Sequence, residues 1–315
     1  MQSDGKLVVA GYSDNGSNNH FALVRYNDNG SLDTSFNGTG KVSTAIGSIS
    51  DYSSSVAVQT DGKILVAGYA HNANNDFGED RFALVRYKAN GSLDTSFNGT
   101  GKLTTDLSGL DYGSSVAVQR DGKIVVAGSS ADNSSGNDDF ALVRYNANGS
   151  LDTSFNGTGK VITDLGISFS GSLLDPLTSG RSVAVQSDGK IVVAGNVSGS
   201  NCDFALVRYN ADGSLDTTFN GTGTVTTAIG SGSDIGQSVA VQSDGKIVVA
   251  GYSHNGSNYD FALARYHGTT ELTVSPNTAT AFGSIQKPLF AERTFTVSNI
   301  GHSTFSGSAS GVRCI

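Results

Sequence analysis

The sequence is poor in several residue types that mark particular protein classes. Its 315 residues include no Trp, 1 Met, 3 Pro and 2 Cys, and charged residues make up only 15%. The two cysteines, Cys202 and Cys314, cannot build the disulfide framework of small secreted domains. The 41 glycines show no three-residue period, which excludes a collagen-like chain. Low charge combined with regular apolar clusters argues against intrinsic disorder.

Charge and hydropathy exclude further classes. The formal net charge is −8, and binding of nucleic acid needs a basic surface, so we expect no nucleic-acid partner. No apolar run approaches the roughly 20 residues of a membrane-spanning helix, so we expect no membrane insertion. The segment 1–6 is polar and lacks the apolar centre of a signal peptide.

A long internal repeat dominates the chain. Each copy carries Asp-Gly-Lys within an apolar run, continues to Phe-Ala-Leu-Val-Arg-Tyr, and then reaches Asn-Gly-Ser-Leu-Asp-Thr-Ser-Phe-Asn-Gly-Thr-Gly. We identify five copies, of which the first and last are incomplete. The Asp-Gly-Lys motifs begin at Asp4, Asp61, Asp121, Asp188 and Asp244.

Each copy predicts four short β-strands. Val, Ile, Phe, Tyr and Thr dominate these runs, and Gly, Asn, Asp and Ser separate them. Asp188-Gly189 indicates a tight hairpin, because such turns need positive φ. No segment has a convincing 3.6-residue apolar period. In the fourth copy the predicted strands are, in order, 160–165, 182–186, 190–194 and 204–209.

The apolar pattern favours a β-propeller. The third strand, 190–194, is apolar at nearly every position, which is typical of a strand buried on both faces. Repeated four-stranded antiparallel units with both faces covered are the blades of a propeller. We therefore predict an all-β propeller of about five four-stranded antiparallel blades, the first one incomplete. A parallel β-helix is the alternative, although its coils are shorter and lack tight Asp-Gly hairpins.

Two recurrent segments resemble a known family. The run Phe204–Gly223 and its companion Ser182–Gly195 are similar to the bacterial delta-60 repeat, and the resemblance extends over residues 1–266. It implies a propeller fold and a place in large surface or secreted bacterial proteins, hence an extracellular or cell-surface location. The resemblance brings no catalytic residues.

The repeats and the tail predict two regions. Residues 1–268 form the propeller, which falls two strands short of five full blades because copy one supplies only its third and fourth strands. We expect a partial chain, part of a larger one, or a ring completed by something else. Residues 269–315 weakly resemble the opening strands of an immunoglobulin-like surface domain. Alternatively, 272–274 pairs beside 6–10 and helps to close the ring.

The connections predict one constant and one variable face. In an antiparallel meander, the second–third and fourth–first connections share one face, and these are nearly invariant between copies. All variation falls in the other connections, such as 69–81, 129–139 and 166–181. Loops on a rigid frame commonly carry recognition, although such loops can also simply be unconstrained.

The variable loops are rich in Tyr, His, Asn and Asp. A Tyr ring can cover an apolar patch while its hydroxyl bonds a polar ligand, which suits glycans. We predict a polysaccharide or a surface protein as partner, the alternative being ordinary surface polarity. Tyr12, His20, Tyr52 and Glu79 lie in the same loops, and the candidate ligand-binding residues are Tyr69, His71, Asp76, Tyr112, Tyr252, His254 and Tyr259.

A repeated arginine on the fourth strand needs an acidic partner if neighbouring blades bury it. The recurrent Asp of the following connection is the expected partner, giving one structural ion pair in each repeat; a solvent-facing arginine is the alternative. The predicted pairs are Arg25 with Asp33, Arg86 with Asp94, Arg144 with Asp152, and Arg208 with Asp216.

We predict no cofactor and no metal site. Asn210, Asp212 and Asp216 form an oxygen-rich loop, but the spacing does not fit an EF-hand. Turn chemistry explains the loop better, and Ca²⁺ remains a minor alternative.

Catalytic signatures are absent: the sequence has no nucleophile elbow, no zinc-type His pair and no Cys-x-x-Cys. We therefore favour a non-catalytic binding or display module, not an enzyme. A hydrolase or lyase with its site in the variable loops or central channel, and a purely structural spacer, are the alternatives.

Overall fold

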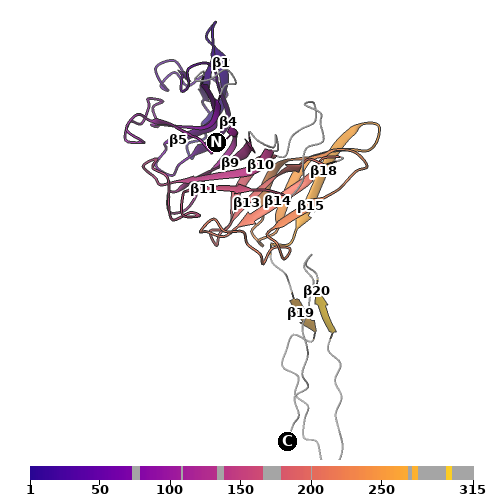
Figure 1. The fold of residues 1–315 in the computed structure, drawn as a ribbon. Coiled ribbons are helices and arrows are strands. Elements are labelled where there is room, and N and C mark those ends of the chain that lie inside the picture. The colour runs from indigo at the N-terminus through magenta and orange to yellow at the C-terminus, as the bar shows by residue number, and fades with distance from the viewer. Residues whose placement is uncertain are drawn as a thin grey trace, which may run out of the picture.

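The computed structural model describes residues 1–72, 79–107, 109–132, 138–165, 179–199, 201–268, 272–275 and 296–299. Figure 1 shows antiparallel sheets that follow one another from the indigo N-terminal end to the orange end of the repeats. Among these residues there is no helix, so none is long and apolar enough to cross a membrane.

The repeats form five sheets. The first is β1 (Leu7–Asp14), β2 (Asn19–Tyr26) and β3 (Lys41–Thr44), and the second is β4 (Asp51–Val58), β5 (Ile64–Asn72), β6 (Glu79–Tyr87) and β7 (Lys102–Thr105). The third is β8 (Gly109–Val118), β9 (Ile124–Asp132), β10 (Asp138–Tyr145) and β11 (Lys160–Thr163). The fourth is β12 (Ser179–Val185), β13 (Ile191–Val197), β14 (Asp203–Tyr209) and β15 (Thr224–Thr227), and the fifth is β16 (Asp234–Val241), β17 (Ile247–His254) and β18 (Tyr259–Tyr266).

The five antiparallel sheets confirm the prediction of an all-β propeller with an incomplete first blade. The phase of the repeat differs from the predicted one. Segment 160–165, expected to open the fourth unit, contributes β11, which pairs with β10 as the last strand of the third sheet. Among the described strands, the first sheet therefore has no opening strand and the fifth has no closing strand.

The first strands of neighbouring sheets mark the edge nearest the propeller axis. β4, β8, β12 and β16 contact one another in succession. A serine on each accepts a hydrogen bond from a valine of the next: Val116 N–H donates to Ser55 Oγ at 3.1 Å, and Val183 N–H to Ser115 Oγ at 3.2 Å. Val239 N–H likewise donates to a serine of β12 at 3.1 Å. These bonds tie the inner strands together.

Four hydrophobic clusters fill the spaces between the five sheets. In each cluster, a Phe and a Leu from one sheet pack against an aliphatic strand of the next sheet, which is β5, β9, β13 or β17. Phe21 and Leu23, for example, pack with Ile64 and Val66, all at most 1% exposed. The continuous apolar runs in the sequence exist because these strands are covered on both sides.

A recurrent arginine joins each sheet to its successor. Arg86 Nε lies 2.9 Å from Asp94 Oδ2, its guanidinium lies 4.5 Å from the centre of the Phe97 ring, and its Nη1 donates to the carbonyl of Ala147 in the next sheet. The motif lysine points to the same acid, with Lys63 Nζ 3.9 Å from Asp94. The structure places all four predicted pairs in contact, with Nε–Oδ2 distances of 2.7–2.9 Å for Arg25–Asp33, Arg86–Asp94, Arg144–Asp152 and Arg208–Asp216.

The two end sheets each have one uncovered face. On the fifth sheet Phe261 is 89% exposed and Leu263 is 68% exposed, and on the first sheet Leu7 and Val9 are 43% and 53% exposed. The ring is therefore open between β1 and β18 (Figure 1).

The tail contributes a separate two-stranded sheet of β19 (Leu272–Ser275) and β20 (Thr296–Asn299). β19 pairs with β20, and among the described strands β1 pairs with β2 alone, so the alternative pairing of 272–274 with 6–10 is not the one present. The remaining tail lies outside the described residues, and its immunoglobulin-like character stays a prediction.

Candidate functional site: a tyrosine row on the variable face

The strand directions give the sheets two different faces. The connections 59–63 and 27–40 and their equivalents lie on the constant face, where turn chemistry is repeated. Asn37, for example, has φ 52° and its N–H donates to Asn90 O in the next sheet at 2.8 Å. The connections 15–18 and 45–50 and their equivalents lie on the opposite, variable face.

Four tyrosines form a continuous row on the variable face. Tyr12 meets Tyr52 edge to face with ring centres 4.9 Å apart, and Tyr52 stacks on Tyr69 at 5.1 Å. Tyr69 meets Tyr112 edge to face at 5.0 Å. The row starts on β1, crosses β4 and β5, and ends on β8, so three sheets contribute to it. We call these four residues the tyrosine row.

Strand register explains how the row forms. Tyr52 and Tyr69 are directly paired on β4 and β5, which places their side chains on the same side of the sheet. Tyr12 and Tyr69 occupy equivalent positions of the repeat, and so do Tyr52 and Tyr112. The contact of Tyr12 with Tyr52 across the first sheet boundary is therefore repeated by the contact of Tyr69 with Tyr112 across the second. The row is therefore a product of the repeat and not of any one loop.

Polar groups border the tyrosine row at the end formed by Tyr112. His71 Nδ1 lies 2.8 Å from Asp80 Oδ1. Burial, the charge of Asp80 and a hydrogen bond to its carboxylate raise the pKa of Tyr112. Asp80 is itself 7% exposed. At the other end Asn19 Nδ2 donates to the Tyr52 hydroxyl at 3.1 Å.

Asp138, on β10 of the third sheet, has a buried carboxyl oxygen that forms no hydrogen bond within the described part of the chain. This oxygen is Oδ1, and the residue is 7% exposed. Burial and the neighbouring charge of Asp139 raise the pKa of Asp138 to about 6. Its charge acts on Tyr112, which places it close to the row. A buried, unsatisfied carboxyl group is a candidate for contact with a ligand.

Three other buried aspartates have a structural role. Asp51 and Asp234 accept hydrogen bonds from backbone N–H groups of the preceding connection, for example Ile46 N to Asp51 Oδ2 at 2.7 Å. Asp111 accepts from Leu107 N at 2.6 Å and from a serine hydroxyl at 2.5 Å, while burial raises its pKa to about 6. These groups fix the connections that lead into β4, β8 and β16.

A second aromatic group lies on the fifth sheet. Tyr259 meets Tyr252 at 5.2 Å and His254 at 4.8 Å between ring centres, both edge to face. The aromatic series stops at Tyr112, because Ser129 in the third sheet and Asn196 in the fourth take the position of Tyr69. Asn196 Oδ1 accepts from Arg181 Nε at 2.9 Å.

The sequence matches a described repeat family. The sequence profile of the domain of unknown function DUF5122 beta-propeller matches residues 2–36, 59–97, 119–155, 186–219 and 242–268. The chain belongs to the DUF5122 family. The match recurs in every copy of the repeat, in agreement with the predicted bacterial propeller-repeat family.

Several solved structures are similar to parts of this DUF5122 propeller at low sequence identity. A protein of unknown function from Bacteroides caccae is 14% identical, with a TM-score of 0.44 over 84% of this chain and 73% of that one. An endo-1,4-beta-xylanase from Bacteroides thetaiotaomicron is 10% identical, with a TM-score of 0.42 over 84% and 93%. An endo-arabinase from the same organism is 10% identical, with a TM-score of 0.42 over 85% and 91%. No curated protein matches the chain.

The predicted ligand-binding residues fall into two groups of the DUF5122 propeller. Tyr69 and Tyr112 belong to the tyrosine row and His71 binds Asp80 beside it, whereas Tyr252, His254 and Tyr259 gather on the fifth sheet. Asp76 lies outside the described residues. The sequence analysis placed these aromatic residues in loops; the structure places them in strands, on the variable-face side. The sequence analysis did not select Asp80 or Asp138. Asp80 pairs directly with His71 across the β5–β6 hairpin, so the hairpin register could have identified it.

The oxygen-rich loop of the constant face forms turns. Asp212 Oδ1 accepts from Ser214 N at 3.0 Å and from its hydroxyl at 2.6 Å, and Asp216 binds Arg208 and Lys190. Over the described ranges, no group of three or more His, Cys, Asp or Glu could hold a metal ion. The Ca²⁺ alternative stays a prediction.

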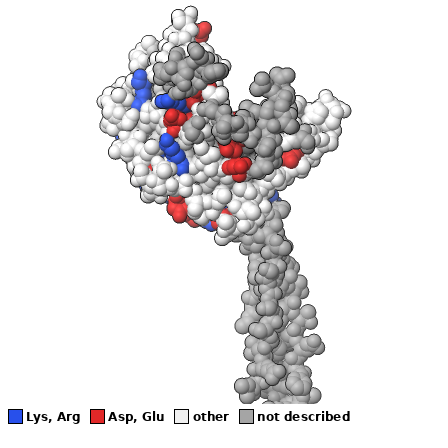
Figure 2. Space-filling view, viewed as in Figure 1, with Lys and Arg blue, Asp and Glu red and all other residues white. Residues whose placement is uncertain are grey.

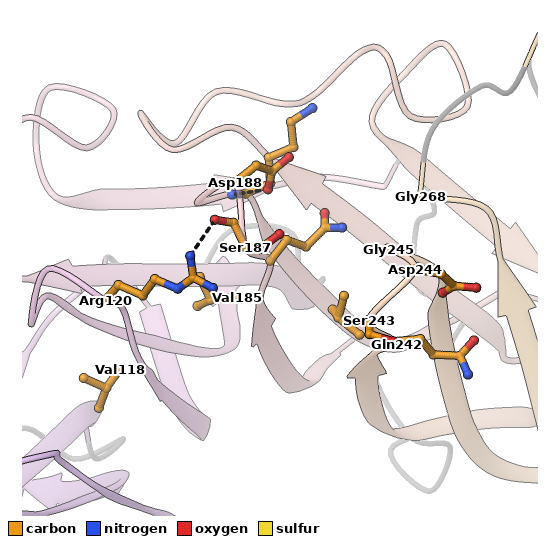
Figure 3. A pocket seen from close by; sticks show the side chains of 13 residues that line it. Val118, Arg120, Val185, Ser187, Asp188, Gln242, Ser243, Asp244, Gly245 and Gly268 are labelled. Carbon is orange, nitrogen blue, oxygen red and sulfur yellow. Dashed lines mark hydrogen bonds between the residues drawn. The ribbon is translucent and has the colours of Figure 1, made fainter.

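A pocket of about 450 Å³ opens on the constant face between the β8–β9, β12–β13 and β16–β17 turns. In Figure 3, Arg120 donates to the carbonyl of Ser187 at 3.4 Å, and Asp188 and Asp244 come from neighbouring turns. Its lining is made of the repeated turn residues, and none of the predicted ligand-binding residues contributes. Buried Cys202 is likewise not part of it.

Proposed function

We propose that this DUF5122 propeller is a non-catalytic binding module of a bacterial surface or secreted protein, and that it holds a neutral polysaccharide along the tyrosine row. The observation that carries the proposal is the row itself: four tyrosines in ring contact across three sheets of the variable face. An extended strip of aromatic rings with polar edges matches the alternating apolar and hydroxyl-bearing surfaces of a sugar chain. The surface or secreted location is proposed on the resemblance to the bacterial delta-60 repeat.

The charge of the molecule supports a neutral ligand. A net charge of −8 disfavours polyanionic chains. Figure 2 shows a surface on which uncharged residues predominate, with the acidic and basic side chains in small separate patches. The polar groups beside the row, Asn19, His71 and Asp80, supply donors and acceptors for hydroxyl groups. A carboxylate such as Asp138, with an unsatisfied oxygen, can accept a hydrogen bond from a sugar hydroxyl.

Affinity electrophoresis in gels containing neutral polysaccharides tests the proposal, with calorimetry on the oligosaccharide of any chain that retards the protein. Tyr12→Ala and Tyr69→Ala are expected to weaken binding about tenfold each, because each removes one stacking ring. Tyr12→Phe keeps the ring and should bind nearly as the unaltered protein does. Ile162→Ala, an exposed apolar side chain on β11, is the control and should leave affinity unchanged.

Three results would reject the proposal. Migration that no polysaccharide alters would favour the structural spacer. Capture of a surface protein that depends on Tyr69, without any polysaccharide binding, would assign the row to a protein partner. Equal losses from Tyr12→Ala and Ile162→Ala would show that the row has no special part. Tyr259→Ala tests separately whether the aromatic group of the fifth sheet belongs to the same site.

One observation favours a hydrolase or lyase as the second candidate. Asp138 has a pKa raised to about 6, while the nearby Asp80 is bonded to His71, so the two acids lie in contrasting environments. Pairs of this kind serve general acid–base chemistry. Incubation with the bound polysaccharide, followed by measurement of new reducing or unsaturated ends, decides between the two. Cleavage that Asp138→Asn abolishes without loss of binding would establish the enzyme.

A further inference from the structure

Apolar side chains on the outer faces of the first and fifth sheets are exposed, whereas their equivalents in the other sheets are buried. Phe261 is 89% exposed, whereas its equivalents on the other sheets are at most 1% exposed. Leu263 is 68% exposed, and its equivalents are also at most 1% exposed. On the first sheet Leu7 and Val9 are 43% and 53% exposed, against at most 1% at the equivalent positions. The buried equivalents are Phe21, Phe82, Phe140 and Phe204; Leu23, Leu84, Leu142 and Leu206; Ile64, Ile124, Ile191 and Ile247; and Val66, Val126, Val193 and Val249.

The two exposed faces are opposite halves of one interface. Inside the chain this interface occurs four times, and each time Phe and Leu of the earlier sheet pack on Ile and Val of the later sheet. The fifth sheet presents the Phe–Leu half, as Phe261 and Leu263. The first sheet presents the aliphatic half, as Leu7 and Val9. Neither half is complementary to itself, because the packing joins an aromatic side to an aliphatic one.

Charge adds to this complementarity. In the four complete interfaces the strand arginine donates to a backbone carbonyl of the next sheet, at Ala89, Ala147, Ala211 or Gly268. The fifth arginine, Arg265, is exposed, and repeat five ends before the aspartate that binds its equivalents. On the first sheet the residue at the acceptor position is Asp28, also exposed. Arg265 would therefore meet a carbonyl together with an added negative charge.

We propose that a second copy of this chain docks head to tail, with its first sheet on the fifth sheet of the first copy. Leu7 and Val9 of one copy cover Phe261 and Leu263 of the other, and Arg265 lies against Asp28. The contact continues the repeated packing of sheets across two molecules. It is heterologous, so each bound copy leaves one further half-interface open unless the arrangement closes into a ring.

The intermolecular contact is smaller than the internal ones. Inside the chain the opening strand, such as β4, packs on both β1 and β2 of the preceding sheet. The first sheet has no such strand, so only its β1 and β2 are available to the partner. Association is therefore expected to be reversible and to depend on concentration, and not to be obligate.

Light scattering coupled to size-exclusion chromatography tests the proposal over a range of protein concentrations. The unaltered chain should shift from 32.3 kDa towards at least twice that mass as concentration rises. Leu263→Asp and Val9→Asp should each remain monomeric, because each destroys one half of the interface in every molecule. Mixing these two variants should restore a species of twice the monomer mass, since one brings an intact fifth sheet and the other an intact first sheet.

Charge exchange and a surface control complete the design. Arg265→Asp should weaken self-association, and mixing it with Asp28→Arg should restore pairing. Ile162→Asp, on the exposed part of β11, should associate as the unaltered chain does. Circular dichroism spectra with unchanged melting temperatures show that the variants are folded. A chain that stays monomeric at every concentration, single variants that still form dimers, or a mixture that does not pair would overturn the proposal.

Discussion

The guanidinium of Arg25 spans the boundary between two sheets: its Nε bonds Asp33 within its own sheet at 2.8 Å, and its Nη1 donates to the carbonyl of Ala89 in the next at 2.5 Å. The side chain also lies 4.5 Å from the centre of the Phe36 ring. One buried cation thus satisfies an acid, a carbonyl and an aromatic face together. Its recurrence explains why Arg, Asp and Phe keep a fixed spacing in the repeat.

Removing the acid of one pair should destabilise the whole array. In Asp94→Asn the buried Arg86 loses its counter-charge, and we expect the free energy of unfolding to fall by about 3 kcal/mol. Asp61→Asn is the matched control, because Asp61 pairs with Lys63 at the surface with its side chain 51% exposed, and it should cost less than about 1 kcal/mol. Urea titrations measure both; equal effects would contradict a structural role for the buried pair.

The glycine within the strand that follows each Asp-Gly-Lys turn should be replaceable in the first sheet only. At Gly68 an added Cβ would lie 2.0 Å from the carbonyl oxygen of Tyr52, so Gly68→Ala should cost about 3 kcal/mol or more. At the equivalent Gly11 an added Cβ meets nothing within 4 Å, because the first sheet has no strand there. Gly11→Ala should change the melting temperature little. A severe loss in Gly11→Ala would show that the space beside β1 is filled.

Acid should destabilise the protein through the aspartates of the repeat. Burial tends to raise the pKa of Asp216, but hydrogen bonds from Lys190 and Thr218 and the charge of Arg208 outweigh it and lower the pKa to about 2. The pKa values of Asp33, Asp94 and Asp152 are also lowered. A depressed folded-state pKa contributes stability above the unfolded value of 3.8 that is lost as pH falls towards 2. Denaturant titrations between pH 5 and 2 should show this loss, and Asp216→Asn should reduce its steepness.

Asp138 should act in the opposite direction. Its pKa is raised from 3.8 to about 6, so its ionised form is disfavoured in the folded protein, and its contribution to stability should improve as pH falls from about 7 to 4. Asp138→Asn should therefore stabilise the protein at pH 7 by about 2 kcal/mol and have little effect near pH 4. Melting temperatures across this range measure the difference. If the melting temperatures of Asp138→Asn and the unaltered protein differ by the same amount at every pH, titration of Asp138 does not cause the difference.

The repeat made most of the fold predictable. Asp188-Gly189 indicated a tight turn, and Gly189 has φ 88° between β12 and β13. The fully apolar run 190–194 predicted a strand covered on both faces, and Ile191 and Val193 are completely buried. The phase was not predictable. Lys160–Thr163 is four residues long and lies between two sheets in the sequence, and only its hydrogen bonds to β10 decide which sheet it joins.

The candidate site was predictable only in part. The sequence indicated the variable face, placed Tyr12 and Tyr52 on it, and gave Tyr69, His71 and Tyr112 as candidate ligand-binding residues. It did not show that Tyr12, Tyr52, Tyr69 and Tyr112 touch, because that contact depends on the packing of one sheet on the next and not on spacing along the chain. Asp138 carried no signal in the sequence, since its importance comes from burial and from an oxygen that forms no hydrogen bond with other described residues.

The serine–valine hydrogen bonds along the inner strands have a consequence for how the molecule comes apart. β8 and β12 are held from both directions, whereas β16 is held from one and the first sheet has no inner strand at all. In such a linear array, stability is greatest where every unit has two neighbours. Amide hydrogen exchange should therefore be slowest in β8 and β12, and unfolding should proceed from the termini of the array towards its centre.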